Sequence, residues 1–107
     1  MIHLVATRHA HQRARQRIGW STRTLDRMLE RVFYFGVRSA DCPRTLRAYL
    51  DTLPHEPGHN RVRIYGQQIF IFAQPAPESA ALLTVYQLPP AYRAAAHRAQ
   101  TRTPSRN

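Results

Sequence analysis

The segment RVRIYGQQIFIF constrains the fold of this chain more than any other stretch. Two runs that alternate as strands do, residues 61–65 and 68–73, are separated only by Gly66 and Gln67. A two-residue loop with a leading glycine suits a type II′ turn, which permits one pairing register between its strands. The expected pairs are Tyr65 with Gln68, Ile64 with Ile69, Arg63 with Phe70, Val62 with Ile71 and Arg61 with Phe72. The sequence therefore predicts a β-hairpin.

This register sorts the hairpin side chains onto two faces. One face is aliphatic, and the other mixes guanidinium and aromatic groups. The mixed face carries Arg61, Arg63, Tyr65, Phe70 and Phe72. Alternation in the first strand indicates one open sheet face, whereas the IFIF run indicates that the second strand is central and covered on both sides. A third strand is expected over 81–88, with Thr84 and Tyr86 able to lie on either face.

Helical spacing fills the first half of the chain. We expect a helix from Thr7, as its N-cap, to about residue 18, because Ala10, Ala14 and Ile18 recur every four residues and Gly19 follows. A second helix, capped by Ser21 or Thr22, should run to Gly36. A third should begin at Asp41, with Pro43 in its first turn, and end at Pro54.

The remaining segments complete the predicted architecture. Residues 2–6 are expected to form an edge strand or a short segment leading into the first helix, and residues 91–100 a short helix. The expected fold is a single α+β domain over residues 1–100, with three N-terminal helices packed on one face of a three- to four-stranded antiparallel sheet. Residues 101–107 are expected to be a flexible basic tail.

The charge balance points to a polyanionic partner. The 107 residues include 16 basic and 6 acidic side chains, for a net charge of +10, and every basic residue is Arg. Guanidinium groups bind phosphate bidentately, although a GC-rich genome would also replace Lys by Arg. The sequence shows no apolar run long enough for a membrane helix and no signal-like start. We therefore expect a cytoplasmic protein that does not associate with a membrane. A lone Cys42 excludes an intramolecular disulfide.

One candidate site lies on the first predicted helix. His9, Arg13 and Arg17 are four residues apart and form a stripe beside the alanine face. A histidine that exchanges protons and two guanidiniums that hold a phosphate are the groups needed to cleave RNA by attack of its 2′-hydroxyl. The alternative is that His9 packs at the helix start and the arginines form a solvated or phosphate-positioning face.

A second candidate site lies on the sheet. Arg63 beside Tyr65, with Tyr86 on the neighbouring strand, would stack a base or hold a scissile phosphate. The alternative is packing of these side chains under the C-terminal helix. The other histidines, His3, His11, His55, His59 and His97, show no clear carboxylate or thiolate partners. We therefore expect no metal and no cofactor, and we interpret Cys42 as a small buried side chain rather than a reactive thiol.

Four motifs carry a resemblance to known proteins. TRHAHQRARQRIG, with the pattern T-x-H-A-x-x-R-x-x-x-R-x-G, is followed by RAYLDTL, NRVRIYGQQIFIF and LLTVYQLP. Over residues 7–89 the chain resembles a group of small bacterial and phage proteins, which is distantly similar to RelE-like and BrnT-like toxins of the barnase-EndoU-colicin-RelE ribonuclease fold. The resemblance implies an Arg- and Tyr-based site at Arg61, Arg63, Tyr65 and Tyr86. Those toxins begin with a strand or two, whereas here most of the expected helices come before the sheet. The alternative is therefore a relative that binds without cleaving.

These observations support two hypotheses about function. The first is a small RNA-binding protein of a phage or mobile element, with metal-independent endoribonuclease activity as an open possibility. Its nucleic-acid-binding residues would be Arg13, Arg17, Arg61 and Arg63, and its catalytic residues would be His9, Arg63, Tyr65 and Tyr86. The alternative is a non-enzymatic phage accessory or anti-defence protein whose basic face docks on an acidic protein, an antitoxin or a host ribonucleoprotein.

Overall fold

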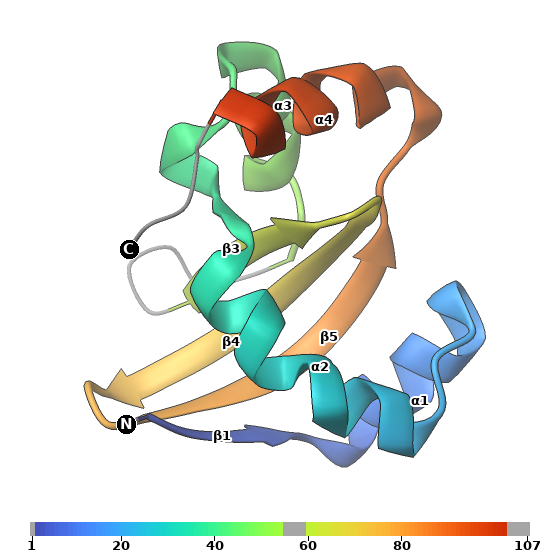
Figure 1. Ribbon diagram of the computed structural model, residues 1–107, viewed down its shortest axis with the longest axis vertical. Helices are drawn as coiled ribbons and strands as arrows, with labels where there is room; N and C mark the ends of the chain where they lie inside the picture. The colour runs from blue at the N-terminus through green and yellow to red at the C-terminus, as the bar shows by residue number, and fades with distance from the viewer. Residues whose placement is uncertain (1, 55–59, 103–107) are drawn as a thin grey trace.

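The computed structural model describes residues 2–54 and 60–102 as a sheet with helices on both faces (Figure 1). The elements, in chain order, are β1 (His3–Ala6), α1 (Arg8–Ile18), α2 (Thr22–Phe35), β2 (Val37–Arg38), the 3-10 turn η1 (Ser39–Asp41), α3 (Arg44–Asp51), β3 (Asn60–Tyr65), β4 (Gln68–Ala76), β5 (Ser79–Gln87), the 3-10 turn η2 (Pro90–Tyr92) and α4 (Arg93–Arg102). The α+β class expected from the sequence is confirmed.

The sheet has five strands in the order β1-β5-β4-β3-β2. The β3–β4 hairpin has the predicted register at all five pairs. Gly66 has a φ of 63°, and Gln67 has a negative φ, as a type II′ turn requires. The prediction of a wholly antiparallel sheet is wrong, because β1 pairs in parallel with β5. β2, with only two residues, was not predicted and lies antiparallel to β3.

The helices divide between the two faces of the sheet, contrary to the expectation that three would share one face. A buried cluster on one face joins α1 and α2 to β4 and β5 through residues such as Ala14, Leu29 and Phe70. A second cluster joins α3 and α4 to β2, β3 and β4 through residues such as Leu46 and Ile71. The aliphatic and aromatic faces of β4 therefore each have their own core, which confirms that β4 is central.

Local signals predicted the first two helices well. The Thr7 side chain accepts a hydrogen bond from the Ala10 amide, Ser21 caps α2 in the same way, and Gly19 ends α1 with a φ of 71°. The third helix differs from the prediction: α3 starts at Arg44, after Pro43, and Asp41 instead pairs with Arg38.

Gly36, at the C-terminal end of α2, is required for a reason that the sequence did not show. Its backbone is extended rather than left-handed, with a φ of −65°. A Cβ atom at this position would lie 2.5 Å from the Val32 carbonyl oxygen and 2.9 Å from the Arg63 Cβ. Glycine is therefore needed for the close approach of α2 to β3.

α4 replaces the short C-terminal helix expected over 91–100. It begins at Arg93 after η2 and includes Thr101 and Arg102, whereas the rest of the predicted tail lies outside the described residues. Within the described part of the chain, no helix is both long and apolar enough to cross a lipid bilayer.

Candidate nucleic-acid interface

α1 lies against β5 through its smallest side chains. Ala10 and Ala14 are fully buried, and the Thr7 amide donates to the Leu82 carbonyl, so the start of α1 is fixed to the middle of β5. His9, Arg13 and Arg17 form a stripe next to these alanines on the helix, and the last of them, Arg17, reaches the edge of β5. We call these three residues the α1 stripe.

The first two members of the α1 stripe contact one another. Arg13 Nε donates to His9 Nε2 over 3.2 Å, and Arg13 Nη1 donates to Gln16 Oε1 over 3.3 Å. A histidine nitrogen that accepts a hydrogen bond carries no proton, so this contact requires a neutral imidazole with its proton on Nδ1. The pair is exposed, and its polar atoms face solvent. An imidazole and a guanidinium group thus lie side by side.

Arg17 joins α1 to the edge of β5 where β1 has ended. The last pair between β1 and β5 is Ala6 with Leu82. Beyond it, Arg17 Nη1 donates to the Val85 carbonyl over 3.1 Å, and the Arg17 guanidinium lies 4.5 Å from the centroid of the Tyr86 ring. The structure brings two predicted site residues together here. It also gives Arg17 a structural role, because it satisfies a carbonyl at a strand edge.

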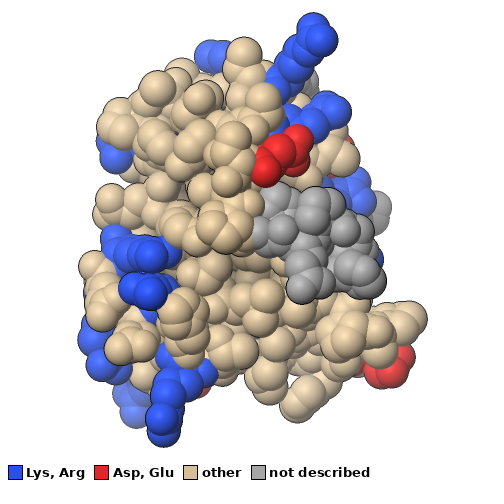
Figure 2. Space-filling model, turned by 180° about the vertical axis from the view of Figure 1, so that it is seen from behind, with Lys and Arg blue, Asp and Glu red and all other residues tan. Residues whose placement is uncertain are grey.

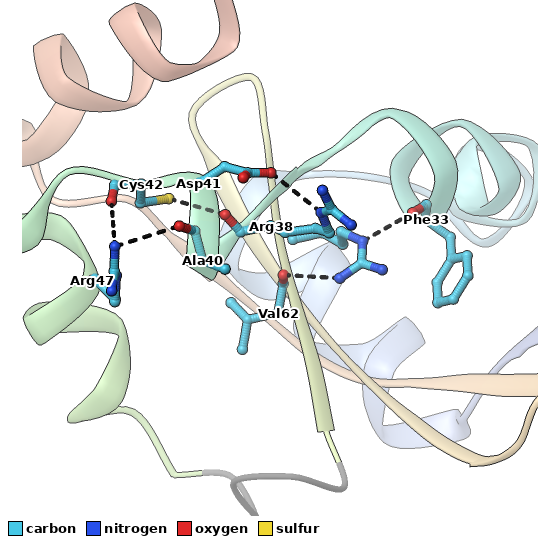
Figure 3. A network of polar contacts seen from close by, with 8 residues as sticks. Phe33, Arg38, Ala40, Asp41, Cys42, Arg47 and Val62 are labelled. Atoms are coloured by element: carbon cyan, nitrogen blue, oxygen red, sulfur yellow. Dashed lines mark hydrogen bonds and ion pairs between the residues drawn. The ribbon is translucent and has the colours of Figure 1, made fainter. Parts of the chain in front are cut away.

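Arg63 occupies a different environment from the one predicted. Its Nε donates to the Phe33 carbonyl over 2.9 Å, its Nη1 donates to the Val62 carbonyl over 3.2 Å, and its guanidinium lies 4.9 Å from the Phe33 ring (Figure 3). Phe33 is in the last turn of α2, where carbonyls lack partners within the helix and attract cations. Arg63 therefore fastens the end of α2 to β3.

The sheet face that carries Arg61, Arg63 and Tyr65 is not open, which corrects the prediction. Phe70 and Phe72, on the same face, are completely buried beneath α2, and Tyr65 packs against this cluster. Tyr86 pairs with Ile69 and packs against the opposite cluster. Since β4 also separates β3 from β5, the structure does not assemble the predicted group of Arg63, Tyr65 and Tyr86.

Arg61 and Arg63 instead line a cleft beside the end of β2. The cleft has a volume of about 360 Å³. Its lining residues are Arg38, Ser39, Ala40, Asn60, Arg61, Val62 and Arg63. Arg38, which donates from Nε to Asp41 over 3.2 Å, was missed by sequence reasoning. No local signal marks it, because its position depends on the pairing of the two-residue strand β2 with β3. Three guanidinium groups around one cleft favour an anionic ligand.

The sequence also missed the role of His11. His11 Nε2 lies 3.3 Å from Asp26 Oδ1 on α2, and its side chain is only 21% exposed. The His11 Nδ1 atom is buried, with no hydrogen-bond partner among the described residues. The expectation that His11 lacks a carboxylate partner is therefore wrong. The spacing within α1 could not reveal the contact, because it arises where two helices meet.

Cys42 is buried, as expected, and its environment disfavours reactivity. Burial raises the pKa of its thiol from 9.0 to about 11; the Asp41 charge adds to this rise, and Arg47 opposes it. The thiol lies 3.5 Å from the Arg38 carbonyl, and Arg47 holds the same turn through the carbonyls of Ala40 and Cys42 (Figure 3). Among the described residues, no group of three or more His, Cys, Asp or Glu side chains could hold a metal ion, and His55 and His59 lie outside those residues.

Arginine side chains gather along the side of the molecule formed by α1, which is the left side in Figure 2. Four of these arginines, Arg8, Arg13, Arg15 and Arg17, belong to α1, which has no acidic residue in its first turn.

Comparison with known proteins found no matching family model, curated protein or solved structure.

Proposed function

We propose that this protein binds single-stranded RNA along α1 and the adjoining edge of β5. The observation that carries the proposal is the position of Arg17, which a backbone carbonyl and the Tyr86 ring hold at the strand edge beside Arg13 and His9. An arginine held in one orientation loses less side-chain entropy when it binds a ligand. A guanidinium has five N–H donors, so the bond from Arg17 to Val85 is compatible with a phosphate contact.

The cleft lined by Arg38, Arg61 and Arg63 would supply a second position for a phosphate. It lies at β2 and β3, on the other side of β4 from β5. The net charge of +10 favours the approach of any polyanion. The arginines of α1 and those of the cleft would determine the path of the RNA strand across the surface.

The salt dependence of binding tests this proposal. The affinity of a fluorescent single-stranded RNA should fall steeply between 50 and 200 mM KCl, as expected when phosphates release counterions. Arg13→Ala should lower the slope of log K against log salt by about 0.7, the contribution of one single-strand phosphate. Arg98→Ala is the matched control, since Arg98 is an exposed arginine on α4. Equal slopes for the two variants would indicate unspecific charge attraction, and salt-independent binding would refute the proposal.

Metal-independent RNA cleavage is a second candidate, favoured by the contact between His9 and Arg13. If Arg13 turned to a phosphate, it would release the lone pair of His9 Nε2. That nitrogen would then take the proton of a 2′-hydroxyl while the 2′-oxygen attacks phosphorus. The bond from phosphorus to the 5′-oxygen would break, with water protonating the leaving oxygen, to give a 2′,3′-cyclic phosphate and a 5′-hydroxyl.

The products distinguish cleavage from binding. Wild-type protein incubated with RNA in EDTA should yield discrete 2′,3′-cyclic phosphate ends, detected by mass spectrometry. A substrate with a 2′-O-methyl group at the cut site should remain intact, and His9→Ala should abolish cleavage but retain binding. The catalytic candidate would be refuted if His9→Ala still formed the products, or if the wild-type protein formed no more product than a buffer control. Either result would leave the binding proposal in place.

A further inference from the structure

The β1 side of one sheet face is covered by no described helix. The cluster beneath α3 and α4 draws its strand residues from β2, β3 and β4, but none from β1. On β1, Leu4 and Ala6 pack toward α1 and α2, so the intervening Val5 points to the opposite face, where it is 43% exposed. Among the described residues, this face of β1 and of the adjoining start of β5 therefore carries no helix, whereas Tyr86, near the end of β5, packs at the border of the cluster beneath α3 and α4.

The strand register places small side chains around Val5, with a β-bulge in β5 between Leu82 and Thr84. Val5 pairs with Ala81, and Ala81 pairs on its other side with Ala73, so three small or medium side chains form a row across three strands. Thr84 and Tyr86 follow along β5, opposite Ile71 and Ile69. We call Val5, Ala73, Ala81, Thr84 and Tyr86 the open sheet patch. Neither core cluster includes Val5, Ala73 or Ala81.

The open sheet patch is uncharged and borders the α1 stripe. Its five residues include no Asp, Glu, Lys, Arg or His, and Tyr86 contacts Arg17 directly. Figure 2 views the molecule from the face opposite α2, where an area without described charged side chains adjoins the arginines along α1. An apolar surface with a basic border matches a ligand that has an uncharged part beside a row of negative charges.

We propose that the open sheet patch receives the bases of a single-stranded nucleic acid whose phosphates lie along Arg13 and Arg17. This inference rests on the proposed function and adds the contact to the bases. An unpaired strand has planar uncharged bases on one side and phosphates on the other, and exposed bases stack on aromatic rings and guanidinium groups, which Tyr86 and Arg17 supply at this patch. A second copy of the chain is a poorer occupant, because two molecules of charge +10 repel one another.

An abasic strand separates the base contact from the phosphate contact. Wild-type protein should bind an oligouridine about ten-fold more tightly than an abasic oligonucleotide with the same number of phosphates, and both should show the same salt slope. Oligodeoxythymidine and duplex RNA complete the set: the single-stranded DNA should keep the preference over its abasic form, and the duplex, whose bases are hidden, should bind more weakly than oligouridine. Equal affinities for the oligouridine and abasic strands would overturn this inference, whereas the salt slope would still support the proposed function.

Neutral substitutions locate the contact. Ala81→Gln and Val5→Gln should each reduce the preference for oligouridine several-fold without changing the salt slope. Ala94→Gln, at an exposed alanine on α4, should change neither quantity. Val5→Gln lies on an edge strand, so it remains informative if Ala81→Gln fails to fold. An unchanged preference in a folded Val5→Gln would overturn the inference, as would a dimer in solution that Val5→Gln dissociates, because the patch would then be an interface between copies.

Discussion

The Arg17 guanidinium lies 4.5 Å from the centroid of the Tyr86 ring and donates to the carbonyl of the preceding residue, Val85. These two contacts fix the end of α1 to the part of β5 that β1 does not reach. They make Arg17 both a support of the fold and a component of the proposed interface.

Replacing Arg17 should therefore weaken the fold measurably. Arg17→Ala loses a hydrogen bond and a cation–π contact, so the free energy of unfolding in urea should fall by about 1–2 kcal/mol. Arg17→Lys should have an intermediate effect, since it keeps the charge but not the planar donor group. Arg15→Ala is the control: Arg15 is exposed and reaches Thr22 at 3.4 Å, so its loss should cost less than about 0.5 kcal/mol. Similar losses for Arg15→Ala and Arg17→Ala would contradict the structural role of Arg17.

Arg63→Ala should loosen the end of α2. The change removes the donor to the Phe33 carbonyl and should lower stability by about 2 kcal/mol, because hydrogen bonds from charged groups are among the stronger ones. Hydrogen exchange should become faster in the last turn of α2 but stay unchanged in α4. Uniformly faster exchange in both helices would argue against a local effect. RNA binding by this variant is informative only when it is compared at equal folded fraction.

The two glycines that end α1 and α2 should respond differently to alanine. At Gly36 a Cβ would contact backbone and Arg63 Cβ at 2.5 and 2.9 Å, so overpacking should cost about 2–3 kcal/mol. At Gly19 no atom lies within 4 Å of the added Cβ, and only the strain of its positive φ, about 1–2 kcal/mol, remains. Thermal unfolding of both variants checks the order, and a larger loss for Gly19→Ala would show that the contact at Gly36 relaxes easily.

The Cys42 thiol should make stability depend on pH in the alkaline range. Its pKa is raised from 9.0 to about 11 in the folded chain, so the folded state favours the neutral thiol. Stability is therefore fully retained below pH 9 and is lost as the pH rises through 11, by about 2–3 kcal/mol relative to Cys42→Ala. Urea unfolding of both proteins between pH 7 and 11 measures this difference, and a constant difference would contradict the raised pKa. Alkylation by iodoacetamide at pH 8 should also be slow until the chain unfolds.

Features encoded by neighbouring residues were predictable from the sequence. The caps at Thr7 and Ser21 and the register around Gly66 depend on contacts only a few residues apart, and the structure has all three. Asp41 shows the limit of such reasoning: it has the right chemistry for an N-cap, but the nearby Arg38 pairs with it instead.

Features that join distant segments could not be predicted in the same way. The division of helices between the two sheet faces depends on the side of the sheet along which each connecting segment passes. The spacing of hydrophobic residues does not indicate that side. The candidate site follows the same rule. The α1 stripe is visible in the spacing of His9, Arg13 and Arg17, whereas the contact of Arg17 with Tyr86 spans most of the chain and needs β5 in place.

The parallel pairing of β1 with β5 also affects the order in which the chain can assemble. His3 pairs with Ser79, so β1 has no partner until β5 has been made. Pairings this distant in sequence form slowly because a long loop must close first. Until then α1 lacks the strand on which it packs, and Arg17 has neither Val85 nor Tyr86 beside it. The basic surface would therefore form only after β5 has been made, and chains that stop before β5 would carry its arginines without its geometry.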